Sequence, residues 1–348
     1  MRKWFFESFG GVEKLRLVDA SSPEPGAGEA VVSPSYVGVN PVDRSVLGGR
    51  FDWIRLPHTP GAEVVGRVVS VGDHVGQVRR GDRVAVYPPV FCGTCKWCLR
   101  GEEGSCLENT HLESAPGIIG VVSDGGWSEE FLVPARNLFK LPPSVDDRHV
   151  VGMPVDGLTA QHLLERAELK PGELALIVGA AGGVGSFAVQ LASLRGCTVI
   201  AVCSSEKQAE VVRGLGAGDV VFSGQNRKVS DQVKSIAGGG VDVVIDPVGA
   251  STWKESLACL GPFGRYATCG VLTGRSVELD LLTLYSMQNK VVGSTTGSRR
   301  NFAEVLNYME QGRLRTLIDS EYDFEHIPDA VTRLSVRGRT GKVVAKVN

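Results

Sequence analysis

The sequence predicts an α/β protein of two domains, one rich in β-strands and one built on a doubly wound parallel sheet. Its 348 residues suit two domains. Short β-branched runs between glycines and prolines, such as Ala30–Ser33 and Glu63–Val69, fill the N-terminal part. From Pro154 onward, apolar runs alternate with helical stretches, which is typical of a parallel sheet covered by helices on both faces.

The expected elements of the second domain follow one another closely. A strand at Leu174–Val178 runs into glycines and a helix at Ser186–Ala192. A second strand at Thr198–Val202, another helix and a strand at Val241–Asp246 continue the alternation. After Gly293 the pattern changes, and the last expected elements are an amphipathic helix at Phe302–Met309 and a closing strand at Gly341–Val347.

The composition is that of an ordinary globular protein, with 43% hydrophobic and 22% charged residues. A formal net charge of -2 gives no reason to expect nucleic acid or an anionic membrane as a partner. The N-terminus lacks the apolar run of a signal peptide, and no apolar stretch reaches membrane-spanning length. The expected location is the cytoplasm.

A glycine-rich run at Gly179–Gly185 follows the first strand of the second domain and opens a helix. This context indicates a dinucleotide-binding turn, with the phosphates at the positive end of the helix. Gly182 lets the backbone approach the pyrophosphate, and Gly185 lets the helix approach the strand closely. The alternative is a tight turn that binds nothing. The expected cofactor contacts here are Ala180 (where a glycine is usual), Gly182, Gly183, Val184 and Gly185.

The end of the second strand predicts which dinucleotide binds. NAD-preferring folds carry an acidic residue there, but this chain has the neutral Cys203. Ser204, Ser205 and Lys207 follow and offer groups that bind a 2′-phosphate, which favours NADP(H). Glu206 argues against this interpretation, and Lys207 alternatively belongs to a solvated helix surface.

Four of the eight cysteines form a C-x-x-C-x-x-C-x(7)-C pattern. Tetrahedral zinc takes four such thiolates, and a four-cysteine site keeps no open position for catalysis. The pattern therefore predicts one structural Zn²⁺ per chain. Disulfides and an iron–sulfur cluster are the alternatives. The expected ligands are Cys92, Cys95, Cys98 and Cys106.

Together these motifs resemble the medium-chain dehydrogenase/reductase superfamily, the zinc alcohol dehydrogenases and their zinc-free quinone-reductase relatives. The resemblance also rests on Gly38–Asp43, Pro60–Gly66, Arg80–Val84, Gly125–Glu129 and Gly338–Val344. It implies a GroES-like catalytic domain at 1–155 and 294–348, with the zinc loop at 92–106, and a Rossmann domain at 156–293. It further implies a homodimer or homotetramer, and an active site in the cleft between the domains.

The chain departs from the zinc-dependent members at the positions of the catalytic metal ligands. It has Asn40 and Ala62 where those enzymes carry cysteine and histidine, and Val155 near the third ligand. Val42 replaces the usual hydroxyl of the proton relay, whereas Glu63 is retained. The resemblance is therefore to a hybrid with a structural zinc and a metal-free active site.

These features predict an NADP(H)-dependent oxidoreductase that reduces a ketone, a quinone or an activated C=C bond, because a site without a Lewis acid suits substrates that accept hydride readily. A zinc-dependent alcohol dehydrogenase with atypical ligands and a non-enzymatic, zeta-crystallin-like NADPH-binding protein are the alternatives.

Four residues are candidates for a catalytic role, and Lys342 is a candidate for contact with the cofactor. Asn40 is a candidate for polar contacts near the nicotinamide, or a turn residue before a proline. Tyr87 is a proton donor or a half-buried barrel residue, and Asp156 is an acid or a helix cap. By resemblance, Thr159 lies close to the cofactor. Lys342 contacts the cofactor phosphates or is a strand-edge lysine.

Overall fold

The computed structural model describes residues 1–108 and 117–348, which divide into two compact units. The first unit contains both ends of the chain and consists of Met1–Val155, Ser298–Arg337 and Lys342–Asn348. The second unit consists of Asp156–Gly297 and the short segment Gly338–Gly341.

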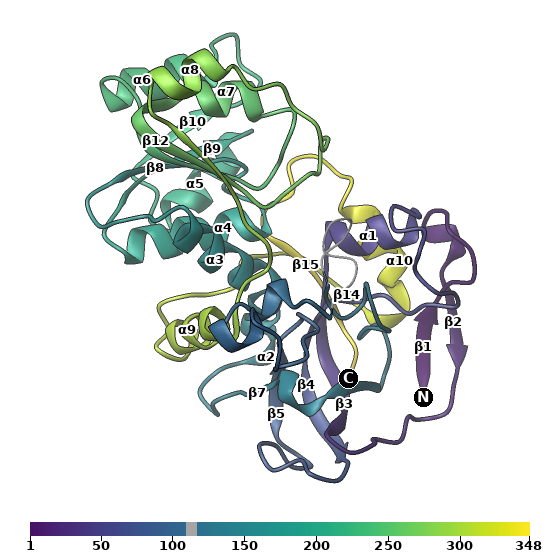
Figure 1. Ribbon diagram of the computed structural model, residues 1–348. Coiled ribbons are helices and arrows are strands. Elements are labelled where there is room, and N and C mark those ends of the chain that lie inside the picture. Colours follow the sequence, from purple (N-terminus) through teal and green to yellow (C-terminus); the bar gives the residue numbers. More distant parts are fainter. Residues whose placement is uncertain (109–116) are drawn as a thin grey trace. The chain divides into compact units, whose positions relative to one another are not determined.

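Within the described residues, the first unit is built around a seven-stranded sheet in the order β14-β15-β3-β4-β5-β7, with β6 also paired to β3 (Figure 1). All of these pairs are antiparallel except β14 with β15. Strands β1 (Arg2–Phe5) and β2 (Arg16–Asp19) form a separate pair. The strands of the larger sheet are β3 (Glu29–Val39), β4 (Glu63–Val71), β5 (Arg83–Val86), β6 (Phe131–Pro134), β7 (Leu138–Lys140), β14 (Ile318–Asp323) and β15 (Lys342–Lys346).

The long strand β3 determines where distant parts of the chain meet. Its C-terminal half pairs with β4 on one side and with β15 on the other, so that Gly38 lies opposite both Glu63 and Val344. Val343 lies opposite Val39 in the same register. The closing strand β15 thus belongs to the first unit. The helices of this unit are α1 (Pro41–Leu47), α2 (Asp147–Val150), α9 (Arg299–Glu310) and α10 (Ile327–Arg333).

Residues 156–297, all of which the structure describes, form a parallel sheet in the order β10-β9-β8-β11-β12-β13. Helices α3, α4 and α5 cover one face, and α6 and α7 the other (Figure 1). The strands are β8 (Leu174–Ile177), β9 (Thr198–Cys203), β10 (Asp219–Phe222), β11 (Val241–Asp246), β12 (Leu260–Thr268) and β13 (Lys290–Gly293). The helices are α3 (Leu158–Arg166), α4 (Gly183–Leu194), α5 (Glu206–Arg213), α6 (Val229–Ala237), α7 (Trp253–Ala258) and α8 (Leu281–Ser286).

The predicted α/β fold, with its doubly wound parallel sheet, is confirmed. The near-continuous apolar strands expected for such a sheet are buried on both faces, as Ala175, Leu176 and Ile177 of β8 show. Among the described residues, no helix is both long and apolar enough to cross a bilayer. The remaining short helical turns are at Val12–Lys14, Cys98–Arg100, Glu103–Ser105, Ala135–Asn137, Met153–Gly157 and Phe324–His326.

Candidate functional site

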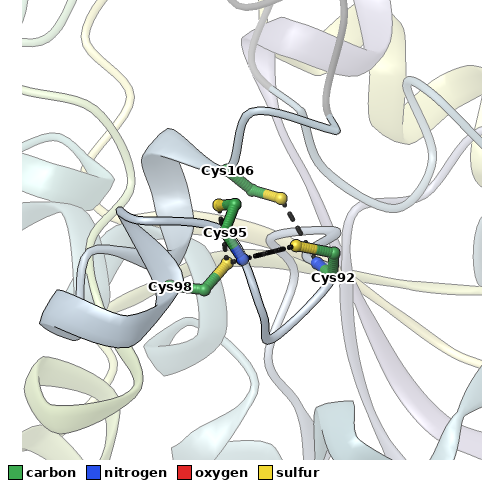
Figure 2. Close-up of side chains that lie close together, drawn as sticks. All are labelled: Cys92, Cys95, Cys98 and Cys106. Carbon is green, nitrogen blue, oxygen red and sulfur yellow. Dashed lines mark hydrogen bonds between the residues drawn. The ribbon is translucent and has the colours of Figure 1, made fainter.

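Four cysteine sulfurs meet in one loop of the first unit (Figure 2). The Sγ atoms of Cys92, Cys95, Cys98 and Cys106 all lie within 4.8 Å of one another, and none is in a disulfide. The Sγ of Cys98 is 3.5 Å from that of Cys95 and 3.9 Å from that of Cys92. Zinc–sulfur bonds of about 2.3 Å at tetrahedral angles place sulfurs about 3.8 Å apart. The cluster therefore fits a tetrahedral zinc ion.

Local hydrogen bonds prepare the sulfur of Cys92 as a ligand. The Sγ of Cys92 accepts the N–H groups of Thr94 at 3.4 Å and Cys95 at 3.3 Å, and the N–H of Cys92 donates to the Sγ of Cys106 at 3.2 Å. Hydrogen bonds from Thr94 and then Cys95 lower the pKa of Cys92 to about 6, which favours the thiolate that a metal needs. Among the described residues, no other group of three or more histidine, cysteine or carboxylate side chains comes together to hold a metal.

The glycine-rich turn of the second unit joins β8 to α4. Gly182 is the N-cap of α4 and Gly179 has a φ of +61°. A Cβ at Gly185 would stand 2.2 Å from the carbonyl oxygen of Gly179, so glycine is needed where the helix approaches the turn. Ala180, Gly182, Gly183, Val184 and Gly185 therefore lie together at the start of the helix, where its N–H groups favour an anion.

A segment from the far end of the sequence lies beside this turn. The N–H of Gly341 donates to the carbonyl of Ala181 at 2.7 Å, and Gln208 Nε2 donates to the carbonyl of Arg339 at 2.9 Å. The sequence analysis did not identify Arg339 as a site residue. Its place between two glycines of the motif Gly338–Val344 was the available signal, but the hydrogen bond from Gly341 to Ala181 that brings this segment beside the turn depends on tertiary structure.

The end of β9 is organised by Gln208. Its Oε1 accepts both the N–H and the hydroxyl of Ser204 at 2.9 Å, while the hydroxyl of Ser205 caps α5 by accepting the N–H of Gln208. Both serine hydroxyls are thus engaged within this strand-to-helix turn. Glu206 is exposed and pairs with Arg213 at 3.0 Å. Lys207 is exposed on α5.

A buried ion pair lies where β3, β4 and β15 meet in the first unit. The Nζ of Lys342 pairs with the Oε2 of Glu63 and donates to the Oδ1 of Asn40. The Nδ2 of Asn40 donates to Glu63 Oε2 at 3.1 Å, and all three residues are at most 3% exposed. A Cβ at Gly38 would stand 2.0 Å from Glu63 Oε2, so this glycine makes room for the pair.

The structure does not place Lys342 at the edge of a sheet, which was one of the two sequence interpretations. Lys342 begins β15, which is flanked by β14 and β3, so it is not on an edge strand. Its ammonium contacts Glu63 and Asn40 in the first unit. The glycine turn at Gly182 belongs to the second unit, where Arg339 is the neighbouring cation by backbone position.

Asp43 adds a further buried acid to this cluster. Its Oδ2 accepts the N–H of Asn40 at 2.7 Å, and the residue is fully buried in the first turn of α1. Burial raises the pKa of Asp43 from an ordinary 3.8 to about 7, although the N–H of Asn40 and the charge of Lys342 act in the opposite direction.

This raised pKa predicts a pH-dependent stability. The folded protein holds the Asp43 proton to higher pH than the unfolded chain, so the contribution is complete below pH 3.8 and lost as the pH rises to about 7. In that window the free energy of unfolding should fall by up to about 1.4 kcal/mol per pH unit relative to an Asp43→Asn variant. Urea unfolding of both proteins at pH 5, 6 and 7 measures this difference, and parallel pH curves would contradict it.

Comparison with known proteins identifies the family. The alcohol dehydrogenase GroES-like domain model matches residues 26–143, and the zinc-binding dehydrogenase model matches residues 183–311. The NAD-dependent alcohol dehydrogenase of Sulfolobus acidocaldarius is 33% identical, with 100% of both chains covered. The chain belongs to the zinc alcohol dehydrogenase-like medium-chain dehydrogenase/reductase superfamily.

Two further comparisons agree with this assignment. The acryloyl-coenzyme A reductase of Metallosphaera sedula is 31% identical over 96% of this chain and 97% of that relative. A solved structure of a thermostable alcohol dehydrogenase from Pyrobaculum aerophilum is 38% identical, with a TM-score of 0.90 and coverage of 100% of this chain and 99% of that one. This dehydrogenase/reductase is thus an oxidoreductase of the alcohol dehydrogenase family.

Two of the three positions that hold catalytic zinc elsewhere in the superfamily donate hydrogen bonds to the carboxylate of Glu63 here. Asn40 donates to it, Ala62 precedes it in the chain, and the N–H of Val155 donates to Glu63 Oε1 at 2.8 Å. None of these three residues offers a thiolate or an imidazole, and the carboxylate already carries the ammonium of Lys342. The residues present do not fit a catalytic zinc ion.

Tyr87 lies in the aromatic core of the first unit. Its ring meets Phe302 edge-on with the ring centroids 5.6 Å apart, and Phe91 at 5.9 Å. The residue is fully buried, where half-burial was expected, and burial raises the pKa of its hydroxyl well above the ordinary value. This environment favours the structural interpretation of Tyr87 over the proton donor.

Asp156 and Thr159 both lie at the start of α3 in the second unit. Asp156 is within the π-helical turn Met153–Gly157 that runs directly into α3, and the N-cap of that helix is Gly157. The Asp156 carboxylate instead adjoins the dinucleotide turn, because a Cβ at Gly183 would stand 2.0 Å from its Oδ2. Thr159 is buried one turn further on. Both candidates therefore lie in the same unit as the glycine turn.

Proposed function

We propose that this chain is an NADP(H)-dependent reductase of ketones, quinones or activated C=C bonds, and that it works without a catalytic zinc. The observation that carries the proposal is the buried pair of Glu63 and Lys342, which lies among the three positions where zinc-dependent relatives hold their metal. When bound, the reduced nicotinamide supplies the hydride. Polar side chains of the protein then stabilise the charge that develops on the substrate.

The glycine turn and its neighbours support dinucleotide binding. The start of α4 offers N–H groups to the pyrophosphate. Arg339 is proposed as a phosphate partner, because it stands two residues before Gly341, whose N–H donates to the carbonyl of Ala181 in that turn. Cys203 ends β9 without a carboxylate, and the nearby Glu206 is paired with Arg213. Both features support NADP(H), although some relatives are named NAD-dependent alcohol dehydrogenases. The four cysteines are proposed to hold one structural zinc.

Cofactor oxidation tests the function directly. NADPH and NADH are supplied in turn with a quinone, a cyclic aryl ketone, an α,β-unsaturated thioester and a simple aldehyde, and loss of nicotinamide absorbance is followed. The unsaturated thioester belongs in the set because two relatives are named acryloyl-coenzyme A reductases. We expect turnover of at least one activated acceptor with NADPH and higher kcat/KM than with NADH. Tight NADPH binding without turnover would instead indicate a binding protein.

The second unit also offers a surface for self-association, which supports a homodimer or homotetramer. Strand β13 ends the parallel sheet, and α8 next to it in the sequence exposes Leu281, Leu282 and Tyr285 at 67%, 61% and 69%. Apolar side chains this exposed on adjacent elements are typical of an interface.

We therefore expect the protein to elute as a dimer or tetramer in size-exclusion chromatography with light scattering. Replacing Leu282 and Tyr285 together by aspartate should shift it toward smaller species, because two charges would be buried in the interface. A Leu99→Asp variant, which changes an exposed leucine of the first unit, is the matched control. A monomeric parent protein would contradict this proposal.

A further inference from the structure

The segment Gly338–Gly341 of the second unit lies beside the glycine turn and extends from it toward β9. At one end, the N–H of Gly341 donates to the carbonyl of Ala181 in the turn at 2.7 Å. Two residues earlier, the carbonyl of Arg339 accepts a hydrogen bond from Nε2 of Gln208 at 2.9 Å. Gln208 is on α5, the helix that follows β9, so the backbone of Arg339 lies on the β9 side of the turn.

This position predicts which half of a dinucleotide Arg339 meets. Strand β9 lies beside β8 in the parallel sheet (Figure 1), and β11 lies on the other side of β8. In a doubly wound fold, the pyrophosphate binds at the turn after the first strand, which is β8 here. The adenosine ribose binds at the end of the next strand in sequence, which is β9, and the other nucleotide half binds on the opposite side. Arg339 therefore belongs to the adenosine half of the site.

Gln208 also determines which of two serine hydroxyls keeps its hydrogen for a phosphate. Since the carbonyl of Arg339 only accepts, Nε2 of Gln208 faces it and Oε1 faces the serines. Ser204 donates both its N–H and its hydroxyl to that Oε1 at 2.9 Å. Ser205 instead accepts the N–H of Gln208, and none of the described residues accepts its hydroxyl hydrogen. Ser205 can thus donate to a phosphate oxygen, whereas the hydroxyl of Ser204 is already used.

The charges at the end of β9 favour an added phosphate. Cys203 ends the strand without a carboxylate, and Glu206 pairs with Arg213 at 3.0 Å. Lys207 is exposed in the first turn of α5, and no carboxylate of the described residues forms an ion pair with it. Together with Arg339, two cations lie near this strand end, and the neighbouring acid is already paired.

We propose that Arg339 and Ser205 bind the 2′-phosphate of NADP(H), and that Gln208 is the positioning residue that holds both. The inference rests on the proposed binding of NADP(H), and it assigns Arg339 to one of the cofactor's phosphates. An arginine forms charge-assisted hydrogen bonds with a phosphate, and the pyrophosphate has the same chemistry. The pyrophosphate is common to NADPH and NADH, so a comparison of the two cofactors distinguishes the two phosphates.

Arg339→Met tests the inference by equilibrium binding. Kd is measured for NADPH and NADH by nicotinamide fluorescence, and for 2′,5′-ADP and 5′-AMP by calorimetry. We expect NADPH and 2′,5′-ADP to bind about 10- to 100-fold more weakly, and NADH and 5′-AMP to stay within about threefold, because only the first two carry the 2′-phosphate. Lys234→Met, which removes an exposed lysine of α6, is the matched control and should leave all four Kd values unchanged.

Variants of Gln208 and the two serines test the positioning. Gln208→Glu keeps an acceptor for Ser204 but cannot donate to the carbonyl of Arg339, and it adds a negative charge beside the 2′-phosphate. It should weaken binding of NADPH and spare that of NADH. Ser205→Ala should weaken NADPH about tenfold relative to NADH, whereas Ser204→Ala should leave the ratio of the two Kd values unchanged. A general loss of stability would affect both cofactors alike, so this ratio reports on the 2′-phosphate.

Equal weakening of NADPH and NADH by Arg339→Met would assign this residue to the pyrophosphate and overturn the inference, and so would no change in either. An unchanged ratio of Kd values in Gln208→Glu would overturn the positioning role, and a larger change in Ser204→Ala than in Ser205→Ala would overturn the choice of donor. A parent protein that binds NADH as tightly as NADPH would contradict the proposed cofactor itself. A parent that prefers NADPH but does not oxidise it would contradict only the proposed reductase activity.

Discussion

Replacing Lys342 by methionine is expected to lower the free energy of unfolding by about 3–5 kcal/mol, the usual effect of removing one partner of a buried ion pair. The remaining carboxylate of Glu63 is 0% exposed and would lose its charged partner. Asn40 and the N–H of Val155 would still donate to it, but neither carries a positive charge. The destabilisation arises from this uncompensated charge, because methionine retains most of the apolar volume of the lysine stem.

Denaturant unfolding followed by tryptophan fluorescence measures this effect. Four of the five tryptophans, all except Trp253, belong to the first unit, so the signal mainly reports on the unit that contains the ion pair. The double variant Lys342→Met/Glu63→Gln is the control, and it should recover most of the lost stability because no charge then remains unpaired. A loss below about 1 kcal/mol in the single variant would indicate an effectively solvated pair and contradict the description of this cluster.

Replacing Cys106 by serine is expected to abolish zinc binding by the four-cysteine loop. Zinc contributes on the order of 10 kcal/mol to the folding of small metal-dependent units, and each of the four thiolates is needed for the closed tetrahedral site. The loop has little core of its own, since Leu99 is 74% and Leu107 is 52% exposed. One hydrogen bond also joins the loop to α9: the backbone N–H of Arg299 donates to the carboxylate of Glu103 at 3.1 Å.

Zinc analysis and limited proteolysis measure this second effect. The parent protein should contain one zinc per chain and resist cleavage in the loop, whereas the variant should contain almost none and be cut there. Cys197→Ser, which changes a cysteine outside the cluster, should behave like the parent. Binding of NADPH to the second unit should survive in both variants. Unchanged zinc content in Cys106→Ser would contradict the proposed ligand set.

Elements defined by local pattern were predictable from the sequence. The strands at 174–178 and 198–202 correspond to β8 and β9, and the helix expected at Phe302–Met309 is α9 (Arg299–Glu310). Each depends on the periodicity of neighbouring residues and on glycines at the ends of elements. The four cysteines lie within fifteen residues, so their spacing alone predicted that they meet.

The contacts of the candidate site were not predictable, because they depend on register between distant strands. Asn40, Glu63 and Lys342 follow or begin three different strands, and only the pairing of β3 with β4 and β15 brings them together. One-dimensional patterns carry no information on such pairing, so the ion pair of Lys342 with Glu63 was not predicted. Gln208 was missed for the same reason, since its partner Arg339 lies 131 residues away.

We propose that this dehydrogenase/reductase transfers hydride without a catalytic zinc. The most direct test measures metal content and turnover on the same sample. The purified protein is assayed with NADPH and its best acceptor before and after dialysis against a chelator, and zinc is counted by mass spectrometry at each stage. We expect one zinc per chain and a kcat that is unchanged when weakly bound metal is removed. A second zinc per chain, or activity that is lost on dialysis and restored by added zinc, would contradict the claim.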